Sequence, residues 1–330
     1  YLAHHPQRHF HLPIFFLRAN FSNRFDRKWL SRWGFRSGTS TGFCSNKFVY
    51  WWPRWQNCRA RRLGFSRMAM LIPRIRRTKV ASIRVNKAKQ KLQNGEVITV
   101  ISGLQSSDII DFLGPMGFDA VWIETEHGSV DWETLGDMTR ACDLWGMTSI
   151  TRVNSNDPGL ITRTLDRGSM GIVVPHVNTR EAAEEAAQST KYSPLGYRGM
   201  FGGRQSFGVI DYFHQANDQT MVVVLLEEVE ALDNLDEILT VPDIDVFFIA
   251  PSDLSQTMGH IGNAGHPEVL EAVDQAIAKI VGAGKVAGTL VNDGNVEAYA
   301  RKGVQYLMTS WNSWVARSAA EFIQKAGNAR

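Results

Sequence analysis

From residue 96 onward, short apolar runs alternate with segments whose apolar positions repeat with the period of an α-helix. Each run is rich in Val, Ile, Leu, Phe or Thr and lacks a clean alternation of apolar and polar positions, as expected of parallel strands that are covered on both faces. Eight such runs cover residues 97–103, 119–125, 147–153, 170–177, 221–228, 245–251, 285–291 and 304–310.

Helix start and stop signals lie between these runs. Asp157 and Pro158 form a capping acid and a first-turn proline ahead of "GLITRTLDRG", which ends at Gly168. His266 and Pro267 similarly precede "EVLEAVDQAIAKIVGAGK", which ends in a pair of glycines. The apolar positions of this second segment are Val269, Leu270, Val273, Ile277 and Ile280.

This alternation predicts an α/β fold, a (β/α)8 TIM barrel, because eight strands with intervening helices in about 235 residues fit that architecture. A doubly wound dinucleotide-binding sheet is the weaker alternative, since no Gly-x-Gly-x-x-Gly follows the first predicted strand. We place the barrel domain at residues 76–330. Residues 1–75 form a basic extension without an assignable fold, which we predict to be disordered.

The charge distribution separates the extension from the barrel. Residues 1–67 hold 11 Arg and 2 Lys against one acid, Asp26, a net charge of +12, so the remaining residues sum to −9 to give the total of +3. Five of the ten tryptophans also lie here, in a sequence with no sustained period of 2 or 3.6. Three interpretations stay open: an upstream extension outside the working protein, which would start at Met68 or Met70; an Arg-rich targeting presequence; or a nucleic-acid-binding arm.

The bulk composition narrows the class of protein. With 44% hydrophobic and 21% charged residues, the chain is expected to be soluble and globular. No apolar run approaches the roughly 20 residues of a membrane span. Cys44, Cys58 and Cys142 are too widely spaced for a disulfide framework or a C-x-x-C metal knuckle, which fits a reducing compartment. A cytoplasmic protein is therefore expected, or a mitochondrial one if residues 1–67 are a genuine presequence.

Ionisable and polar side chains lie at or directly after the ends of several predicted strands. A barrel of this type places its active site at the C-terminal ends of its strands, so these side chains are expected to face one opening. They are Glu124, Glu126 and His127 at the second run, Arg152 at the third, His176 at the fourth, Glu227 and Glu228 at the fifth, and Ser252 and Asp253 after the sixth.

Glu227 and Asp253 are candidates for metal ligands. Two carboxylates with no nearby cysteine suggest an oxygen-ligand site for a hard or borderline divalent cation. Such a site leaves coordination positions open for substrate and water, which is a catalytic arrangement. In the alternative, which stays open, Glu227 caps the helix that follows it and Asp253 caps the turn at "SDLSQTMG".

His127 is a candidate for proton transfer, because Glu124 and Glu126 flank it just past a buried strand. A carboxylate bound to one ring nitrogen would leave the other nitrogen free to take or give a proton. Arg152 would supply a fixed positive charge beside a developing enolate oxygen. The alternatives are a structural or surface histidine, and an arginine in an ion pair at the barrel rim.

Five segments resemble the HpcH/HpaI aldolase family, the metal-dependent class II pyruvate aldolases related to the citrate lyase β subunit. They are "GFDAVWIETEHG", "TRVNSNDPGLITRTLDRGSMGIVVPHVNTREAA", "KYSPLGYRG", "LLEEVEALDNLDEI" and "DVFFIAPSDLSQTMG". Their order and spacing also agree with the family. The resemblance runs from about residue 91 to residue 327, so it covers nearly the whole predicted barrel and none of the basic extension.

The resemblance implies a divalent metal, Mg or Mn first and Co or Zn as alternatives, held by Glu227 and Asp253. Pyruvate would chelate this metal through its carboxylate and keto oxygen. The metal and Arg152 would then stabilise a metal-bound enolate. His127, oriented by Glu124, would move the proton of the aldol hydroxyl group.

The implied reaction is the reversible retro-aldol cleavage of a 4-hydroxy-2-oxo acid into pyruvate and an aldehyde. Arg152 and the backbone amides near Ser252 and Asp253 would bind the oxo acid. Members of the family form hexamers, often with exchange of C-terminal helices. The resemblance therefore also implies a homo-oligomer.

Departures from the family pattern lie close to the implied site. Glu124 replaces the usual Asp and is one methylene longer, which would shift its pairing with His127 and makes Glu126 the alternative partner. Leu225 replaces a common Gln, Glu228 replaces the usual Thr, and "GPADLS" becomes "APSDLS" through Ala250 and Ser252. These changes bear on substrate preference more than on the metal.

Two other functions stay open. An acyl-CoA lyase of the citrate lyase β or malyl-CoA lyase type keeps the superfamily but would need basic residues for the CoA phosphates, and the barrel sequence holds no clear cluster of them. A nucleic-acid-binding protein would use the basic extension and keep the barrel as a scaffold. Residues 200–220, rich in aromatic residues and glycine, are interpreted as either a substrate lid or a subunit contact.

Overall fold

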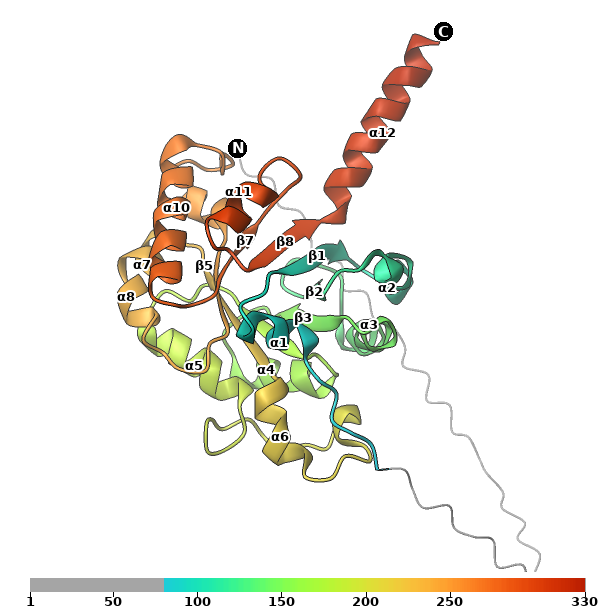
Figure 1. Ribbon diagram of the computed structural model, residues 1–330, viewed down its shortest axis with the longest axis vertical. Helices are drawn as coiled ribbons and strands as arrows, with labels where there is room; N and C mark the ends of the chain where they lie inside the picture. Colours follow the sequence, from blue (N-terminus) through green and yellow to red (C-terminus); the bar gives the residue numbers. More distant parts are fainter. Residues whose placement is uncertain (1–79, 330) are drawn as a thin grey trace, which may run out of the picture. The chain divides into compact units, whose positions relative to one another are not determined.

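Eight parallel strands pair in chain order in the computed structural model of the protein, which describes residues 80–329 (Figure 1). β8 pairs with β1, so the sheet closes into a barrel. Each strand lies within three residues of a predicted run at both ends, so the expected (β/α)8 barrel is confirmed. The strands are β1 (Ile98–Leu104), β2 (Ala120–Glu124), β3 (Thr148–Arg152), β4 (Gly171–Val174), β5 (Met221–Leu226), β6 (Val246–Ile249), β7 (Ala287–Leu290) and β8 (Tyr306–Ser310).

The predicted extension, residues 1–75, lies outside the described residues, as do residues 76–79. The domain boundary at residue 76, the three interpretations of residues 1–67 and the cellular location therefore stay predictions. Among the helices between residues 80 and 329, none combines the length and the apolar character needed to traverse a lipid bilayer.

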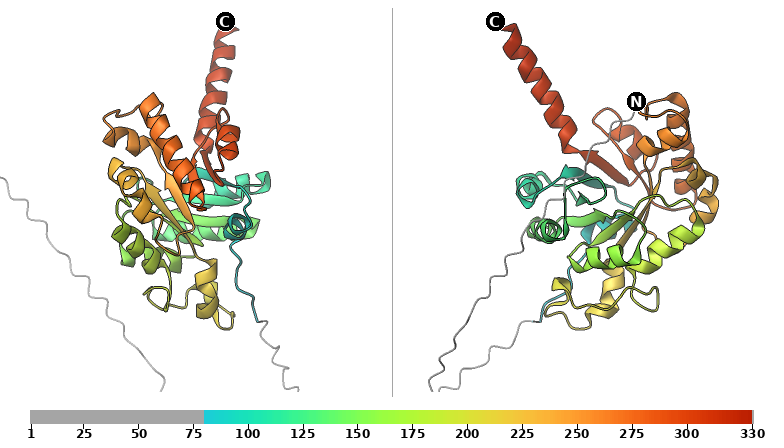
Figure 2. Two further views of the ribbon diagram at one scale, coloured as in Figure 1. Left: turned by 60° about the vertical axis from the view of Figure 1, so that its left-hand side comes forward. Right: turned by 180° about the vertical axis from the view of Figure 1, so that it is seen from behind.

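Helices follow the strands along the chain, and most of them cover the outside of the barrel (Figures 1 and 2). The α-helices are α1 (Lys87–Gln93), α2 (Ser107–Leu113), α3 (Trp132–Trp145), α4 (Pro158–Asp166), α5 (Arg180–Thr190), α6 (Tyr212–Gln219), α7 (Val229–Asp233), α8 (Leu235–Ile238), α9 (Pro251–Thr257), α10 (Pro267–Gly282), α11 (Val296–Arg301) and α12 (Trp311–Asn328). Two short 3-10 helices are η2 (Gly114–Met116) and η3 (Arg204–Ser206).

Both helices predicted from capping signals are present. The Asp157 carboxylate accepts a hydrogen bond from a first-turn amide of α4 at 2.8 Å. His266 Nδ1 accepts one from the Glu268 N–H at 3.3 Å, at the start of α10. Leu270, an apolar position of α10, is 42% exposed, because it lies about 100° around the helix from the buried Val269.

The barrel interior is filled by apolar side chains that point inward from the strands. The ring centroids of Trp122 and Phe248 lie 5.4 Å apart, and those of Phe248 and Tyr306 lie 5.8 Å apart. These rings form a floor beneath the C-terminal ends of the strands, because the next residues in each strand lie closer to the opening.

The alternation of side chains then brings ionisable groups to the open end of the interior. Successive side chains of a strand point to opposite faces, so the second residue beyond an inward-facing one points inward again. This spacing joins Trp122 to Glu124 on β2, Ile150 to Arg152 on β3, and Leu225 to Glu227 at the end of β5.

Residues 200–220 lie at the opposite end of the barrel, near the N-terminal ends of the strands. Gln205 Nε2 donates a hydrogen bond to the carbonyl of Ser169, just before β4, at 3.0 Å. Gln219 Oε1 accepts one at 2.9 Å from the N–H of Asn86, which precedes α1 and β1. Figure 1 accordingly shows α6 beside the segment that leads into α1. The interpretation as a lid over the chain's own cavity is therefore wrong, whereas a subunit contact stays a prediction.

The last helix, α12, extends away from the barrel (Figures 1 and 2). Its first turn is attached to the barrel, since Trp311 Nε1 donates a hydrogen bond to the Gly103 carbonyl at 3.0 Å. None of its residues is buried, and Val315, Phe322 and Ile323 are 50%, 73% and 68% exposed. The helix thus presents apolar side chains that the described residues of this chain do not cover.

Candidate active site

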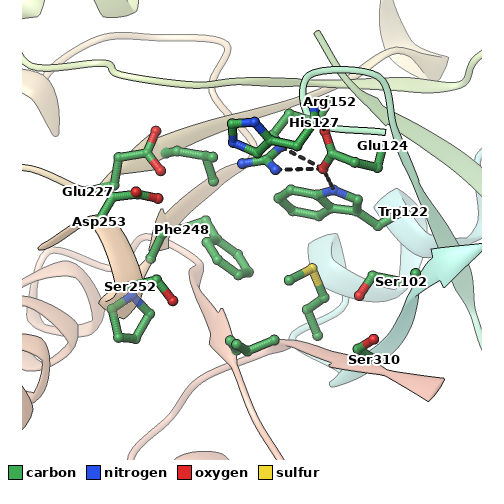
Figure 3. Close-up of a pocket in the computed structure, with 16 residues that line it drawn as sticks. Ser102, Trp122, Glu124, His127, Arg152, Glu227, Phe248, Ser252, Asp253 and Ser310 are labelled. Carbon is green, nitrogen blue, oxygen red and sulfur yellow. Dashed lines mark hydrogen bonds and ion pairs between the residues drawn. The ribbon is translucent and has the colours of Figure 1, made fainter. Parts of the chain in front are cut away.

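A cavity of about 420 Å³ lies at the C-terminal ends of the strands (Figure 3). Much of its wall is apolar, with Trp122, Leu225, Phe248, Leu290 and Met308 among the lining residues. Every residue predicted to act in catalysis, substrate binding or metal binding lines this same cavity. These residues are Glu124, His127, Arg152, Glu227, Ser252 and Asp253.

Glu227 and Asp253 lie on the same side of the cavity (Figure 3). Glu227 is only 1% exposed. Burial raises the pKa of the Glu227 carboxyl above its usual range, and the negative charge of Asp253 raises it further. A hydrogen bond from the His176 N–H and the charge of Arg152 oppose this effect without cancelling it. The negative charge of Glu227 is therefore unfavourable in the absence of a cation.

The capping alternative for these two acids is not found within residues 80–329. α7 starts after Glu228 and α9 starts after Ala250, and neither start has a side-chain capping hydrogen bond. The Glu227 carboxylate instead accepts a hydrogen bond from the N–H of His176 at 2.8 Å. The Glu227 side chain thus contacts the cavity and the loop after β4, and it does not cap the helix that follows it.

In metal-free protein, Glu227→Gln is expected to raise the melting temperature at neutral pH. A carboxyl with a raised pKa contributes stability that is fully present below its unfolded-state pKa and is lost as the pH rises through its folded-state pKa. The neutral amide avoids this loss, and its oxygen still accepts the His176 N–H. By calorimetry, the melting temperature is expected to rise by roughly 2–4 °C for each kcal/mol of unfolding free energy recovered. This rise should shrink as the pH is lowered. A lower melting temperature of the variant at neutral pH would contradict this.

Arg152 is held by two acids at the edge of the cavity. β2 and β3 pair with Glu124 opposite Arg152, so the two side chains emerge next to each other. Arg152 Nε donates a hydrogen bond to Glu124 Oε2 at 2.7 Å, and Nη2 lies 2.7 Å from the same oxygen. Arg152 Nη1 lies 3.1 Å from Glu126 Oε2. Both interpretations of Arg152 thus agree with its position, because it is ion-paired and it also lines the cavity.

Glu124 contacts the main chain of His127 but not its ring. Glu124 Oε1 accepts hydrogen bonds from the N–H groups of Glu126 at 2.7 Å and His127 at 3.2 Å, and Oε2 is taken by Arg152 and by Trp122 Nε1. The expected hydrogen bond from the imidazole of His127 to the Glu124 carboxylate is therefore absent among the described residues. Among the described residues, the carboxylate oxygen within 4 Å of a His127 ring nitrogen is Glu126 Oε2, 3.8 Å from Nε2, and the side chain of His127 is 70% exposed.

His176, Glu228 and Asn178 form a group to which the sequence analysis gave no role, although His176 and Glu228 were expected at the same opening. His176 Nδ1 lies 2.8 Å from Glu228 Oε1, and Asn178 Nδ2 donates to Glu228 Oε2 at 2.6 Å. Burial lowers the pKa of His176, but the hydrogen bond to Glu228 and the charges of Glu227, Glu228 and Glu126 together raise it above its usual value. Two features of the sequence could have indicated this group: the doublet Glu227-Glu228 at the end of the fifth predicted strand, and a histidine at the end of the fourth.

A second set of side chains that could bind a metal ion lies at the start of α10. The ligand atoms of His260, His266 and Glu268 all lie within 4.8 Å of one another. The two imidazole rings, however, are stacked with centroids 3.6 Å apart and planes inclined by 13°. Ring-nitrogen lone pairs lie in the ring plane, so those of two nearly parallel rings do not converge on one ion. The set is therefore a weaker metal candidate than Glu227 and Asp253.

Comparison with known proteins decides the family. A family model described as HpcH/HpaI aldolase/citrate lyase matches residues 98–312, which is most of the barrel. The chain belongs to the HpcH/HpaI family. A 4-hydroxy-2-oxo-heptane-1,7-dioate aldolase of Shigella sonnei (strain Ss046) is 36% identical to this HpcH/HpaI chain over 226 residues, which cover 67% of this chain and 86% of the relative.

Two further relatives agree with this assignment. A 5-keto-4-deoxy-D-glucarate aldolase of Shigella boydii serotype 18 (strain CDC 3083-94 / BS512) is 34% identical over 244 residues, covering 72% of this chain and 94% of the relative. The crystal structure of an HpcH/HpaI aldolase/citrate lyase family protein from Burkholderia cenocepacia J2315 superposes with a TM-score of 0.69 at 28% identity, covering 73% of this chain and 99% of that chain. This HpcH/HpaI protein is accordingly an enzyme of the aldolase type, a carbon–carbon lyase. The acyl-CoA lyase alternative is less supported, because both curated relatives are named as aldolases.

Proposed function

We propose that the protein is a class II pyruvate aldolase that reversibly cleaves a 4-hydroxy-2-oxo acid into pyruvate and an aldehyde. The observation that carries this proposal is the placement of Glu227, Asp253 and Arg152 around one cavity at the C-terminal end of the barrel. Two carboxylates and a guanidinium are suited to a substrate that develops negative charge on an oxygen atom. The substrate named for the Shigella sonnei relative is itself a 4-hydroxy-2-oxo acid.

Glu227 and Asp253 would hold a divalent cation, Mg or Mn first and Co or Zn as alternatives. The residues fit such an ion, because both ligands are carboxylates, and the pKa of the buried Glu227 carboxyl is raised by burial and by the charge of Asp253. When bound, the cation acts as a Lewis acid that polarises a carbonyl group and offsets charge on its oxygen.

Arg152 and the start of α9 would bind and orient the oxo acid. The guanidinium is fixed by Glu124 and Glu126, so it keeps its position without reorganising as charge develops on the substrate. α9 begins with Pro251, and the first-turn amides that follow, those of Ser252 and Asp253, have no partner within the helix itself. These amides are therefore suited to receive the carboxylate of the substrate.

His127 would move the proton of the aldol hydroxyl group. Its ring lines the cavity and is open to solvent, and its main-chain N–H is held by Glu124. A ring that can exchange protons with water and also reach a substrate hydroxyl is suited to general acid–base catalysis. Glu126, 3.8 Å from the ring, is the acid placed to hold one ring nitrogen when the substrate is bound.

A pyruvate-release assay over a panel of 4-hydroxy-2-oxo acids, with and without EDTA, tests this proposal. We expect release from at least one member of the panel, loss of activity with EDTA and recovery on addition of Mg²⁺ or Mn²⁺. Pyruvate release that is insensitive to EDTA, or release only from CoA thioesters, would count against a metal-dependent aldolase.

We also propose that the protein is a homo-oligomer, a hexamer by its resemblance to the family. The exposed apolar side chains of α12 support a contact between copies, because a helix with such a face is stabilised when another surface covers it. The double substitution Phe322→Ser and Ile323→Ser is expected to yield a smaller assembly by light scattering. An unchanged mass would exclude this face from the contact, and Glu321→Gln on the same helix is the matched control.

A further inference from the structure

The two adjacent glutamates after β5 contact different parts of the molecule. Glu227 is almost fully buried and lines the cavity. The side chain of Glu228 is 28% exposed, and its two oxygens are engaged by His176 Nδ1 and Asn178 Nδ2. Glu228 therefore binds the loop after β4 to the loop after β5, whereas Glu227 faces the site.

His176 adopts a backbone conformation that a residue with a Cβ atom rarely adopts. Its φ is +55°, in the left-handed region, where the side chain comes close to the main chain. In this conformation the His176 N–H donates a hydrogen bond to Glu227 Oε1 at 2.8 Å. Strain of this kind persists where surrounding contacts hold it, and it is concentrated at functional sites.

The shortest side-chain contact that holds the His176 ring is the one with Glu228. The imidazole lies 2.8 Å from Glu228 Oε1, and the same carboxylate accepts a hydrogen bond from Asn178, two residues further along the loop. The loop is anchored once more by Asn234 Nδ2, which donates to the Asn178 carbonyl at 2.9 Å. One carboxylate thus fixes the loop on both sides of Val177.

We propose that His176 is a positioning residue for Glu227. The left-handed backbone at His176, held by Glu228, aims its N–H at Glu227 Oε1 and so fixes the carboxylate with its other oxygen available to a divalent cation. This inference rests on the proposed function only in that Glu227 takes part in cation binding. His176 acts on Glu227 through its main-chain N–H, and its ring is assigned no contact with the substrate, because Nδ1 is engaged by Glu228 and His176 is not among the residues that line the cavity.

The test compares two substitutions at residue 176 by calorimetric titration of the full chain with Mn²⁺, without substrate. His176→Gly removes the ring but adopts the left-handed backbone readily, so its N–H can still reach Glu227. His176→Val removes the ring and is β-branched, which opposes that backbone. We expect Mn²⁺ affinity to fall by about threefold in the Gly variant and by about tenfold or more in the Val variant. His214→Val, in the exposed part of α6 at the other end of the barrel, is the matched control and should leave the affinity unchanged.

An equal loss of affinity in the Gly and Val variants would overturn the proposal, because the ring and not the backbone would then be responsible. Unchanged affinity in the Val variant would overturn it too. Should His176→Val fail to fold, Glu228→Ala and Glu228→Gln give the same test with residue 176 intact. Gln keeps an oxygen that can bind the ring, so Ala is expected to weaken Mn²⁺ binding several-fold relative to Gln, and equal affinities would reject the role of Glu228.

A failure of the proposed function itself is recognised separately. If Glu227→Gln binds Mn²⁺ as tightly as the wild type, the assigned cation site is wrong. If Glu227→Gln loses Mn²⁺ while the variants at residues 176 and 228 bind it normally, the site stands and only the positioning role of His176 fails.

Discussion

Replacement of either carboxylate of the proposed metal site, by Glu227→Gln or by Asp253→Asn, is expected to abolish metal-dependent pyruvate release. Each change keeps the size of the side chain but removes a negative charge from the pair. A loss of about 4 kcal/mol of transition-state stabilisation corresponds to a rate roughly 1,000-fold lower. The effect is measured as kcat/KM for pyruvate release at saturating Mn²⁺.

Two controls separate this effect from a general change in charge. Glu230→Gln and Asp233→Asn make the same chemical changes at exposed positions of α7, which follows Glu227 and Glu228 in the chain. Both should retain wild-type activity. If either cavity variant kept that activity as well, the assigned ligands would be rejected.

His127→Ala is expected to give the second large effect, a fall in aldol cleavage of roughly 100- to 10,000-fold, the usual contribution of a general acid–base group. Exchange of the pyruvate methyl protons with solvent should fall much less, since that step does not involve the hydroxyl of the 4-hydroxy-2-oxo acid. Cleavage is followed by pyruvate release, and exchange by proton NMR of pyruvate in D₂O.

The ratio of these two rates distinguishes a catalytic histidine from a structural one. A structural defect would lower both rates together, whereas a proton-transfer role lowers cleavage selectively. His214→Ala, which changes an exposed histidine at the far end of the barrel, should alter neither rate. Equal losses of cleavage and exchange in His127→Ala would argue against the proposed role.

The barrel could be predicted from the sequence because its strands are buried on both faces. Two-sided burial leaves continuous apolar runs such as residues 221–226, and these stand out between helices with clear capping residues such as Asp157. The residues that make up the site could also be predicted, since the C-terminal ends of parallel strands meet at one end of a barrel. Glu124, His127, Arg152, Glu227, Ser252 and Asp253, the residues to which a role was assigned in this way, line a single cavity, whereas Glu126, His176 and Glu228 from the same strand ends do not.

The partners within the site could not be predicted in the same way. The pairing of Glu124 with Arg152 depends on the register of β2 against β3, which no local pattern encodes. Glu124 was therefore assigned to the imidazole of His127, its neighbour in sequence, and not to its neighbour across the sheet. The left-handed backbone of His176 was equally hidden, because it is imposed by contacts with Glu227 and Glu228, about 50 residues further along the chain.

The position of residues 200–220 could not be predicted from the sequence either. Their aromatic and glycine content suited a lid over the active site, but the segment follows α5 and therefore lies where a helix returns to the N-terminal end of the next strand. Hydrogen bonds to Ser169 and Asn86 fix it there. Connectivity, and not composition, decides which end of a barrel a loop occupies.

The most direct test of this account is a crystal structure of the protein soaked with Mn²⁺, with an anomalous difference map to locate the ion. We predict one strong peak in the barrel cavity, about 2 Å from a carboxylate oxygen of Glu227 and from one of Asp253. A peak only at His260, His266 and Glu268, or no peak between the two acids, would contradict it.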